Sequence, residues 1–299
     1  MGKIIVVGSS NTDMTVMTDR LPVPGETVLG GCFSMGHGGK GANQAVAAKR
    51  LGGNVGFICK VGRDLFGENA VKHFQEEGLD VSSVMYSDKP SGVALITVDE
   101  KAENCIVVAS GANNDISVED IEAHTYEISS AQIVLLQLEI PVPAVVRAAK
   151  IAHESGAYVV LNPAPACDLP EELYKYVSLV VPNQTEIARM TGIEAKDEAG
   201  AAKAVAALNA KGVKDVVVTM GSKGSMVYTG GVATFIPSKK VVAVDTTAAG
   251  DTFCGGLCVA MSEGKNLVEA ARFATSASAL TVQKRGAQDS IPCRKDISE

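Results

Sequence analysis

Toward its C-terminal end the sequence contains the run Asp245-Thr246-Thr247-Ala248-Ala249-Gly250-Asp251-Thr252-Phe253. The apolar residues 241–244 before it predict a strand, and the residues 253–262 after it predict a helix. Small residues between a strand and a helix let the backbone approach a ligand closely. The amides of Ala249, Gly250 and Asp251 would then lie at the positive end of the helix dipole, where they suit an oxyanion or a transferring phosphoryl group.

Asp251 is the residue of this run that can perform acid–base chemistry. An Asp in the first turn of a helix is most often a capping residue that stabilises the helix end. A carboxylate beside an anion-binding turn can instead act as a general base. The catalytic candidates are therefore Asp251 and the turn Ala248, Ala249 and Gly250 around it.

The central part of the chain alternates between short β-branched runs and segments of helical periodicity. The continuous apolar runs, which are typical of strands covered on both faces, are residues 159–161, 179–181 and 216–219. The helical segments are residues 143–154, 183–191 and 199–211. This order predicts an α/β fold of three layers (α/β/α), with a mainly parallel central sheet, as one domain over residues 1–299.

Two stretches, residues 14–36 and 91–110, interrupt the alternation because they carry strand patterns with no helix between them. The second stretch is typical of a hairpin. We expect both to form a small β-sheet that is inserted into the main domain and covers a cleft as a lid. The alternative is an ordinary hairpin at the edge of the main sheet.

A second glycine-rich run, Gly36-His37-Gly38-Gly39-Lys40-Gly41-Ala42-Asn43-Gln44, opens a predicted helix over residues 42–50. It matches the dinucleotide-binding pattern Gly-x-Gly-x-x-Gly, but it does not directly follow the first strand, as that pattern requires. It is also not a P-loop, because Gly41 follows Lys40 where Ser or Thr is needed. A dinucleotide-dependent oxidoreductase remains a distant alternative.

Composition narrows the class of protein further. The formal net charge of −7 disfavours nucleic acid and anionic membrane surfaces as partners, while small anions can still bind at helix N-termini. The seven cysteines contain no Cys-x-x-Cys pair, so we expect reduced thiols, with Cys254 and Cys258 packed in the core. No apolar run is long enough to span a membrane, and the N-terminus predicts a strand instead of a signal peptide. We therefore expect a cytoplasmic protein.

Together these elements resemble the ribokinase family of carbohydrate kinases. The resemblance extends from residues 6–13 to residues 286–292 and includes two long signatures in order. The first is Gly38-Gly39-Lys40-Gly41-Ala42-Asn43-Gln44-Ala45, with Pro24-Gly25-Glu26-Thr27 upstream, and the second is the run that ends in Gly250-Asp251-Thr252-Phe253. Residues 162–166, 182–186 and 284–288 are most similar to members that act on ribose.

The resemblance implies ATP-dependent phosphorylation of D-ribose at O5, with Mg²⁺ and an activating K⁺, in a homodimer that pairs through the lid. A kinase for 2-deoxyribose, another sugar or a nucleoside remains an alternative, as does a non-catalytic sugar-binding protein of the same fold. The helix cap remains the alternative role for Glu186.

The same resemblance assigns residues to three groups. The sugar group is Asn11, Thr12, Asp13, Gly39, Lys40, Gly41, Ala42, Asn43, Glu139 and Asp251. The nucleotide group is Asn183, Glu186, Thr219, Met220, Gly221, Ser222, Lys223, Gly224, Gly250, Asp251 and Thr275. The monovalent-cation group is Asp245, Thr247, Thr281, Lys284, Gly286 and Ser290.

Overall fold

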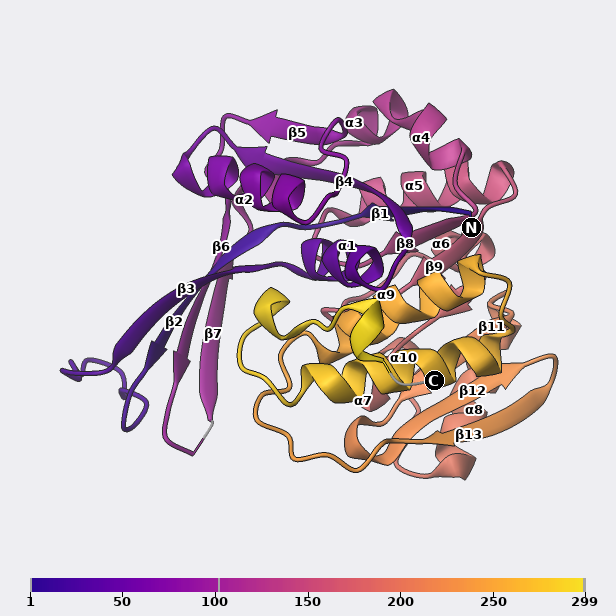
Figure 1. Ribbon diagram of the computed structural model, residues 1–299. Helices are drawn as coiled ribbons and strands as arrows, with labels where there is room; N and C mark the ends of the chain where they lie inside the picture. The colour runs from indigo at the N-terminus through magenta and orange to yellow at the C-terminus, as the bar shows by residue number, and fades with distance from the viewer. Residues whose placement is uncertain (1, 102, 298–299) are drawn as a thin grey trace.

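A large mixed sheet runs through the body of the protein, and a small sheet projects from one side of it (Figure 1). The computed structural model describes residues 2–101 and 103–297; residue 102, in the turn of the expected hairpin, lies outside the described residues. The large sheet has nine strands in the order β13-β12-β11-β10-β9-β8-β1-β4-β5. Its strands are β1 (Lys3–Val7), β4 (Asn54–Gly62), β5 (Val84–Ser87), β8 (Ile133–Leu136), β9 (Tyr158–Leu161), β10 (Leu179–Val180), β11 (Asp215–Thr219), β12 (Gly224–Thr229) and β13 (Val232–Pro237).

The pairing in this sheet confirms the expectation of a mainly parallel sheet. From β5 to β11 every neighbouring pair is parallel, and only the edge pairs β11–β12 and β12–β13 are antiparallel. The predicted strands over residues 159–161, 179–181 and 216–219 correspond to β9, β10 and β11, which lie side by side.

Helices cover both faces of the large sheet, which gives the three predicted layers. On one face, Ile4 and Val6 pack with apolar residues of α1 (Lys40–Arg50), α2 (Leu65–Glu76), α9 (Ala249–Ser262) and α10 (Leu267–Thr281). Ile5 and Val7, which alternate with them along β1, face the second core. That core is formed with α3 (Val118–Ala123), α4 (Thr125–Ser129), α5 (Val142–Glu154), α6 (Glu171–Tyr176), α7 (Gln184–Thr191) and α8 (Glu198–Ala210).

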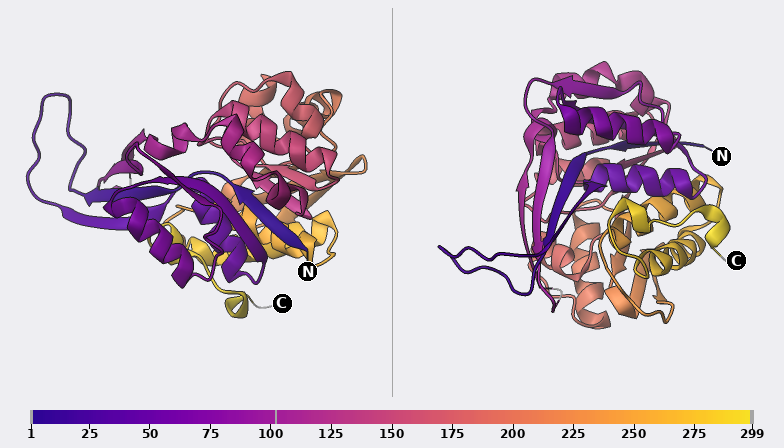
Figure 2. Two further views of the ribbon diagram at one scale, coloured as in Figure 1. Left: turned by 90° about the horizontal axis from the view of Figure 1, so that it is seen from above. Right: turned by 60° about the vertical axis from the view of Figure 1, so that its left-hand side comes forward.

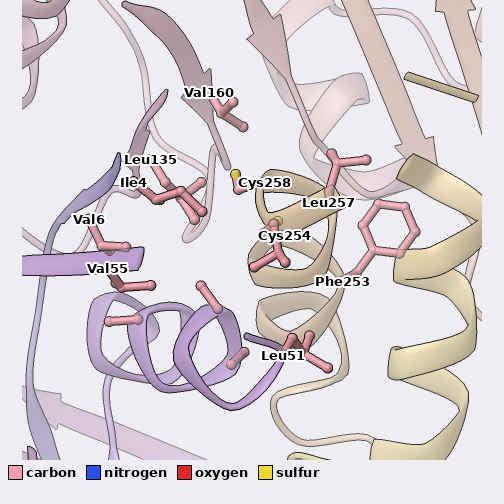
Figure 3. Packing of buried hydrophobic residues seen from close by; sticks show 14 of the residues in the cluster. Ile4, Val6, Leu51, Val55, Leu135, Val160, Phe253, Cys254, Leu257 and Cys258 are labelled. Atoms are coloured by element: carbon pink, nitrogen blue, oxygen red, sulfur yellow. The ribbon is translucent and has the colours of Figure 1, made fainter. Parts of the chain in front are cut away.

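Figure 3 shows the first core, in which Cys254 and Cys258 lie among Leu135, Val160 and Leu257. Both thiols are buried, and burial raises their pKa values well above the usual range. They therefore act as small core residues, as expected from the sequence. No described helix is long and apolar enough to cross a membrane.

The small sheet has four strands in the order β3-β2-β6-β7 and stands apart from the large sheet (Figure 2). Its strands are β2 (Asn11–Met17), β3 (Cys32–Gly38), β6 (Gly92–Val98) and β7 (Asn104–Ala109). The expected hairpin is the antiparallel pair β6–β7, and β2 joins it in parallel. The two predicted stretches thus form one separate sheet, and the edge-hairpin alternative is wrong. In the first stretch, β2 begins at Asn11 and β3 ends at Gly38, so the strands extend slightly beyond the predicted residues 14–36.

Three local predictions are wrong. Residues 241–244 form no strand, although their β-branched pattern predicts one. This segment runs past the end of α10, where the amide of Val244 donates to the carbonyl of Val282 at 2.7 Å, and Val242 is 83% exposed. Helix α9 begins at Ala249 instead of Phe253, and the strand that the apolar pattern of residues 133–138 predicts ends at Leu136, as β8.

The described residues also form four 3₁₀ helices: η1 (Gly111–Asp115), η2 (Gly221–Lys223), η3 (Gln288–Ser290) and η4 (Arg294–Asp296).

Candidate active site

The glycine-rich run brings the start of α1 against the end of β1. Gly39 has φ 87°, and a Cβ there would lie 2.7 Å from the amide nitrogen of Asn11. A Cβ on Gly41 would lie 2.5 Å from the amide nitrogen of Ser9. Atoms cannot approach this closely, so glycine is required at both positions. The run therefore places α1 directly beside the first residues of β2.

Asp13 on β2 lies over the glycine-rich run. A Cβ on Gly38 would be 2.2 Å from Asp13 Oδ2, so the absence of a side chain at Gly38 gives this carboxylate its place. Burial, and then the nearby Glu139 and Asp251, raise the pKa of Asp13 from 3.8 to about 7, against the opposing effect of Lys40. Asp13 is thus a carboxylate held in a crowded, negatively charged site.

Two neighbours that sequence reasoning missed orient the sugar-group residues. Asn113, which is buried in η1, donates from Nδ2 to Asn11 Oδ1 at 2.7 Å, and its Oδ1 accepts from the amide of Ser10 at 2.8 Å. Ser9 Oγ donates to Glu139 Oε2 at 2.5 Å. The sequence assigns neither residue a role, because each acts on a residue that is distant in the sequence.

Glu139 and Lys40 join the glycine-rich run to the end of β8. The backbone amide of Lys40 donates to Glu139 Oε2 at 2.9 Å. The pKa of the Lys40 ammonium is raised, mainly by Asp251 and further by Glu139 and Glu186, although burial opposes this. Lys40 therefore stays charged and stands among three carboxylates that come from three different parts of the chain.

Asp251 lies in the first turn of α9 and is only 7% exposed. Its Oδ2 accepts from Asn43 Nδ2 at 3.0 Å, and its Oδ1 accepts from Gln44 Nε2 at 2.9 Å. Gln44 in turn donates to Asn162 Oδ1 at 3.0 Å and accepts from Gln137 Nε2 at 2.6 Å. Two consecutive residues of α1 thus hold the carboxylate, and Gln44 is a contributor to which the sequence assigns no role.

The turn before Asp251 has the features of an anion-binding site. Ala248 has φ 59° and is the single non-glycine residue with a positive φ in the described chain. Such strained backbone is concentrated at functional sites. The first-turn amides of Gly250 and Asp251 have no partner within the helix. The amide of Ala249 donates to the carbonyl of Thr246 at 3.3 Å, so the expectation that all three amides of the turn are available to an anion is corrected at this residue.

Asp245 binds the C-terminal loop to this turn. Its Oδ1 accepts from the amide and the hydroxyl of Thr247 at 2.9 and 2.7 Å, and its Oδ2 accepts from the amide of Gly286 at 3.0 Å. Burial raises the pKa of Asp245, but these hydrogen bonds outweigh it and hold the pKa below its ordinary value. Asp245, Thr247, Gly286 and the neighbouring Lys284 are therefore brought together.

The hydroxyls of Thr281 and Ser290, which belong to the same predicted group, are engaged elsewhere. Thr281 Oγ1 lies 3.0 Å from Thr252 Oγ1 and donates to the carbonyl of Ala277, and Ser290 Oγ donates to the carbonyl of Ala287 at 2.7 Å. Both side chains are buried. Only their carbonyl oxygens are left as possible cation ligands.

The nucleotide-group residues lie at the ends of β10 and β11. Asn183 caps α7 and pairs with Thr219 in an isolated bridge, so these two loops are adjacent. Both oxygens of Glu186 accept from Asn183, at 2.8 and 2.9 Å, as expected for a cap. Burial also raises the pKa of Glu186, and Lys40 and Asp251 are close enough to influence it. Glu186 is thus both a capping residue and a neighbour of the Asp251 site.

The other nucleotide-group residues occupy two further elements. Gly221, Ser222 and Lys223 form η2, and Met220 and Gly224 flank it between β11 and β12. Thr275 is buried in α10, where its hydroxyl donates to the carbonyl of Ala271 at 2.8 Å. Helix α10 packs against β12 and β13. These residues line the side of the large sheet where its antiparallel strands begin.

The arrangement defines a class of enzyme. The buried carboxylate of Asp251 lies beside the free amides at the start of α9, and Lys40 and the polar residues of the small sheet, such as Asp13, lie near it. Such a site is suited to the transfer of a phosphoryl group to a hydroxyl. Residues 1–294 match the pfkB family of carbohydrate kinases. The chain belongs to this family, as the resemblance in the sequence indicated.

Individual relatives agree with this membership over the whole chain. The chain is 42% identical over 297 residues to the ribokinase of Haemophilus influenzae, and the matched residues cover 99% of this chain and 97% of that protein. It is 44% identical over 300 residues to the bifunctional ribokinase/ribose-5-phosphate isomerase A of Fructilactobacillus sanfranciscensis, where the match spans 99% of this chain and 56% of that protein.

A solved structure of Arabidopsis thaliana ribokinase in complex with ribose and ATP superposes with a TM-score of 0.91 at 34% identity, covering 99% of this chain and 97% of that one. The ribokinase-like α/β fold, with its large mixed sheet and smaller second sheet, is therefore established for this chain.

Proposed function

We propose that this protein transfers the γ-phosphoryl group of ATP to the primary hydroxyl of D-ribose, O5, to give ribose 5-phosphate and ADP. The observation that carries the proposal is the position of Asp251, held by two side-chain amides at the open N-terminus of α9 and beside the wall formed by Asp13 and Glu139. The full-length similarity to ribokinases, one of them solved with ribose and ATP, supports the choice of substrates.

In the proposed reaction, Asp251 accepts the proton of the O5 hydroxyl as this oxygen attacks the γ-phosphorus. The bond between that phosphorus and the β–γ bridging oxygen of ATP breaks, and ADP leaves with the bonding electrons. The amides of Gly250 and Asp251 stabilise the negative charge that develops on the transferring group. Lys40, charged and close to Asp251, is placed to compensate the same charge.

The proposed sugar site uses the wall of β2 and the glycine-rich run. Asp13 can accept hydrogen bonds from two neighbouring hydroxyls, because one carboxylate has two acceptor oxygens. Asn11 and Asn43 each have amide hydrogens left over after their observed contacts, and Thr12, Gly39, Gly41 and Ala42 form the backbone around them. Glu139 completes the wall from β8.

The proposed nucleotide site follows the ends of β10 and β11. Asn183 and Thr219 lie beside each other, and Gly221, Ser222, Lys223 and Gly224 would contact the nucleotide, with Met220 and Thr275 behind them. Among the described residues no cluster of three His, Cys, Asp or Glu side chains could hold a metal. That agrees with Mg²⁺, which keeps several waters and binds mainly through substrate phosphates. Glu186 would hold its water shell, and the ion would neutralise phosphate charge.

The proposed K⁺ site is the junction of Asp245 with the C-terminal loop. The donor set of one carboxylate, Thr247 and backbone carbonyls near Thr281, Lys284, Gly286 and Ser290 is composed of oxygen atoms, which suit a hard cation. A cation there would act by supporting the turn from Ala248 to Asp251.

We further propose that residues 1–299 act as one kinase domain in which the small sheet closes over the sugar. Closure would exclude water and so limit hydrolysis of ATP. The sheet register places Met14, Met35, Leu95 and Val107 on the face opposite Asp13. Leu95 and Val107 are 53% and 68% exposed, so this apolar face is suited to pairing with a second copy.

A substrate screen tests the proposal. The purified protein would be assayed for ADP release with ATP, Mg²⁺ and K⁺ and with ribose, 2-deoxyribose, fructose or adenosine as acceptor. The highest kcat/KM is expected with ribose. Preference for another acceptor would replace ribose with that substrate within the same family, and no turnover with any acceptor would support a sugar-binding role instead.

A further inference from the structure

A line of buried polar side chains leads from Asp251 to the far side of α1. Asn43 Nδ2 donates to Asp251 Oδ2 at 3.0 Å. Gln288 Nε2 donates to Asn43 Oδ1 at 3.1 Å, and Gln288 Oε1 lies 2.8 Å from His73 Nε2. Asn43 and Gln288 are both buried, and Gln288 is only 2% exposed. Three hydrogen bonds thus connect a helix-α2 histidine to the proposed catalytic carboxylate.

The direction of these hydrogen bonds is fixed by the chemistry of their ends. An ionised carboxylate only accepts, so Asn43 must present its NH₂ group to Asp251. Its oxygen then faces Gln288, which must present its own NH₂ group. The oxygen of Gln288 therefore faces His73, and His73 must carry a hydrogen on Nε2 to donate to it. Each amide in the line holds the next one in a single orientation.

His73, at the end of this line of side chains, contacts the small sheet through His37. The rings of His73 and His37 are stacked, with centroids 4.0 Å apart and planes 7° apart. His37 lies on β3, directly before Gly38 of the glycine-rich run. The charged groups around the pair are Glu76, Glu77 and Asp289. Glu77 is paired with Arg50, whose guanidinium also donates to the carbonyls of Gln288 and Ile291.

We propose that Gln288 and His73 are positioning residues of the proposed kinase reaction, which keep the NH₂ group of Asn43, and not its oxygen, directed at Asp251. If the amide of Asn43 rotated by half a turn, its oxygen would face a carboxylate oxygen, and two acceptors would repel each other. Gln44 on the other side of Asp251 is fixed in the same manner by Gln137. The inference rests on the proposed function of Asp251 as the base.

The substitution Gln288→Glu tests the line while keeping the size of the side chain. The new carboxylate places an acceptor opposite Asn43 Oδ1, so Asn43 is expected to turn its NH₂ group toward position 288. We expect kcat to fall about tenfold, as for the loss of one hydrogen bond to a charged group, while KM for ATP changes by less than about twofold. The exposed Gln75 on α2 provides the matched control Gln75→Glu, which should keep the wild-type kcat.

A pair of His73 variants tests the outer hydrogen bond independently and remains decisive if Gln288→Glu does not fold. The amide nitrogen of Gln can take the place of Nε2, whereas that of Asn falls short of it. His73→Gln should therefore retain kcat within about twofold, and His73→Asn should lower it by about three- to tenfold, with equal melting temperatures for both. A packing role of the ring would impair both variants alike and overturn the proposal, as would unchanged kcat in both.

A readout without turnover separates this inference from the proposed function. In ¹⁵N NMR of the wild-type protein at pH 8, His73 should be the tautomer with hydrogen on Nε2, and in Gln288→Leu this preference should be lost. An Nδ1–H tautomer in the wild type would overturn the inference even if ribose is phosphorylated. Absence of sugar phosphorylation by the wild type, with the Nε2–H tautomer present, would overturn the proposed function instead.

Discussion

The two sheets of this protein bury their side chains in opposite ways. The central strands of the large sheet are covered on both faces, as in β1, where Ile4, Ile5, Val6 and Val7 are all inaccessible to solvent or nearly so. The small sheet is covered on neither face over β7, where every residue described is exposed. The centre of the large sheet is therefore a well-packed support, while the small sheet leaves the side chains of β7 open to further contacts.

This difference assigns different tasks to the residues that each sheet carries. Asp251 stands on α9, which packs against the large sheet, and its carboxylate is fixed by two amides. Asp13 stands on the small sheet, and burial and the neighbouring carboxylates raise its pKa to about 7. We expect changes near the large sheet to act on kcat, and changes on the small sheet to act on sugar affinity and on association.

The largest effect is expected for Asp251→Asn. The variant keeps the size of the side chain and one of its two acceptor oxygens, but it cannot accept the proton, so kcat should fall by about 10²-fold or more, the range of a general base. The affinity for ribose, measured by calorimetry, should stay within about threefold of the wild type. A kcat near that of the wild type would show that the base is another residue. It would also contradict the expectation that residues near the large sheet determine kcat.

A smaller effect, on KM, is expected for Asp13→Asn. Loss of the carboxylate should raise KM for ribose about tenfold at pH 8, because hydrogen bonds to charged groups are lost, with kcat changed less. In the wild type, KM for ribose should rise as the pH falls below about 7, since Asp13 then becomes protonated. A KM for ribose that does not depend on pH between 6 and 8 would contradict the role of Asp13.

The raised pKa of Asp13 also makes the stability of the protein depend on pH. The pKa of Asp13 is about 7 in the folded protein against 3.8 ordinarily, so between these values unfolding releases a proton and rising pH destabilises the fold. Asp13→Asn has no carboxylate at this position, so it does not lose stability in this way as the pH rises. Its melting temperature, measured without ligand, should therefore exceed that of the wild type increasingly from pH 4 to pH 7, and a constant difference would contradict the shift.

A further, moderate effect is expected for Asp245→Asn. The amide oxygen of the variant can still accept from Thr247, but the variant loses the acceptor for the Gly286 amide and the charge that would attract a cation. Activation by K⁺, measured as the ratio of kcat with K⁺ to kcat without it, should fall by about three- to tenfold. The control is Glu172→Gln on α6, and equal activation in Asp245→Asn and in the wild type would remove the cation site from this junction.

The smallest effect on turnover is expected for Leu95→Asp on the outer face of the small sheet. Charge on this apolar face should abolish association, so sedimentation should show a monomer where the wild type is a dimer, while kcat stays within about threefold. Tyr126→Asp, at an exposed position on α4, is the control. A monomeric wild-type protein at working concentration would contradict the proposal that this apolar face pairs with a second copy.

The sequence predicted the large sheet well for a physical reason. Strands buried on both faces are continuous apolar runs, so residues 159–161 and 216–219 could be assigned without knowledge of their neighbours. The same reasoning failed at residues 241–244, because a β-branched pattern does not reveal whether another strand is available to pair with it. Val242 and Val244 have the composition of a strand but lie exposed in a loop.

The site was predictable where it is contiguous and unpredictable where it is assembled from distant segments. Asp251, Asn43 and the turn at Ala248 belong to two runs that could be read directly. Gln44 lies in the same run as Asn43, and Gln288 lies in the resembling segment 284–288, but neither segment shows the partner of its residue, and Asn113 lies in no motif. Each of the three acts on a residue more than 100 positions away. Buried polar residues must find partners, but the sequence does not show which ones.

The central claim is that Asp251 activates the primary hydroxyl of ribose toward ATP. It is tested most directly by two-dimensional ¹H–³¹P NMR of the product formed from ATP and ribose by the purified protein. We predict one product in which phosphorus couples to the two C5 protons, formed in equal amount with ADP, and formed at least about 10²-fold more slowly by Asp251→Asn. A phosphate coupled to the C1 proton, or ADP and free phosphate without a sugar phosphate, would contradict the account.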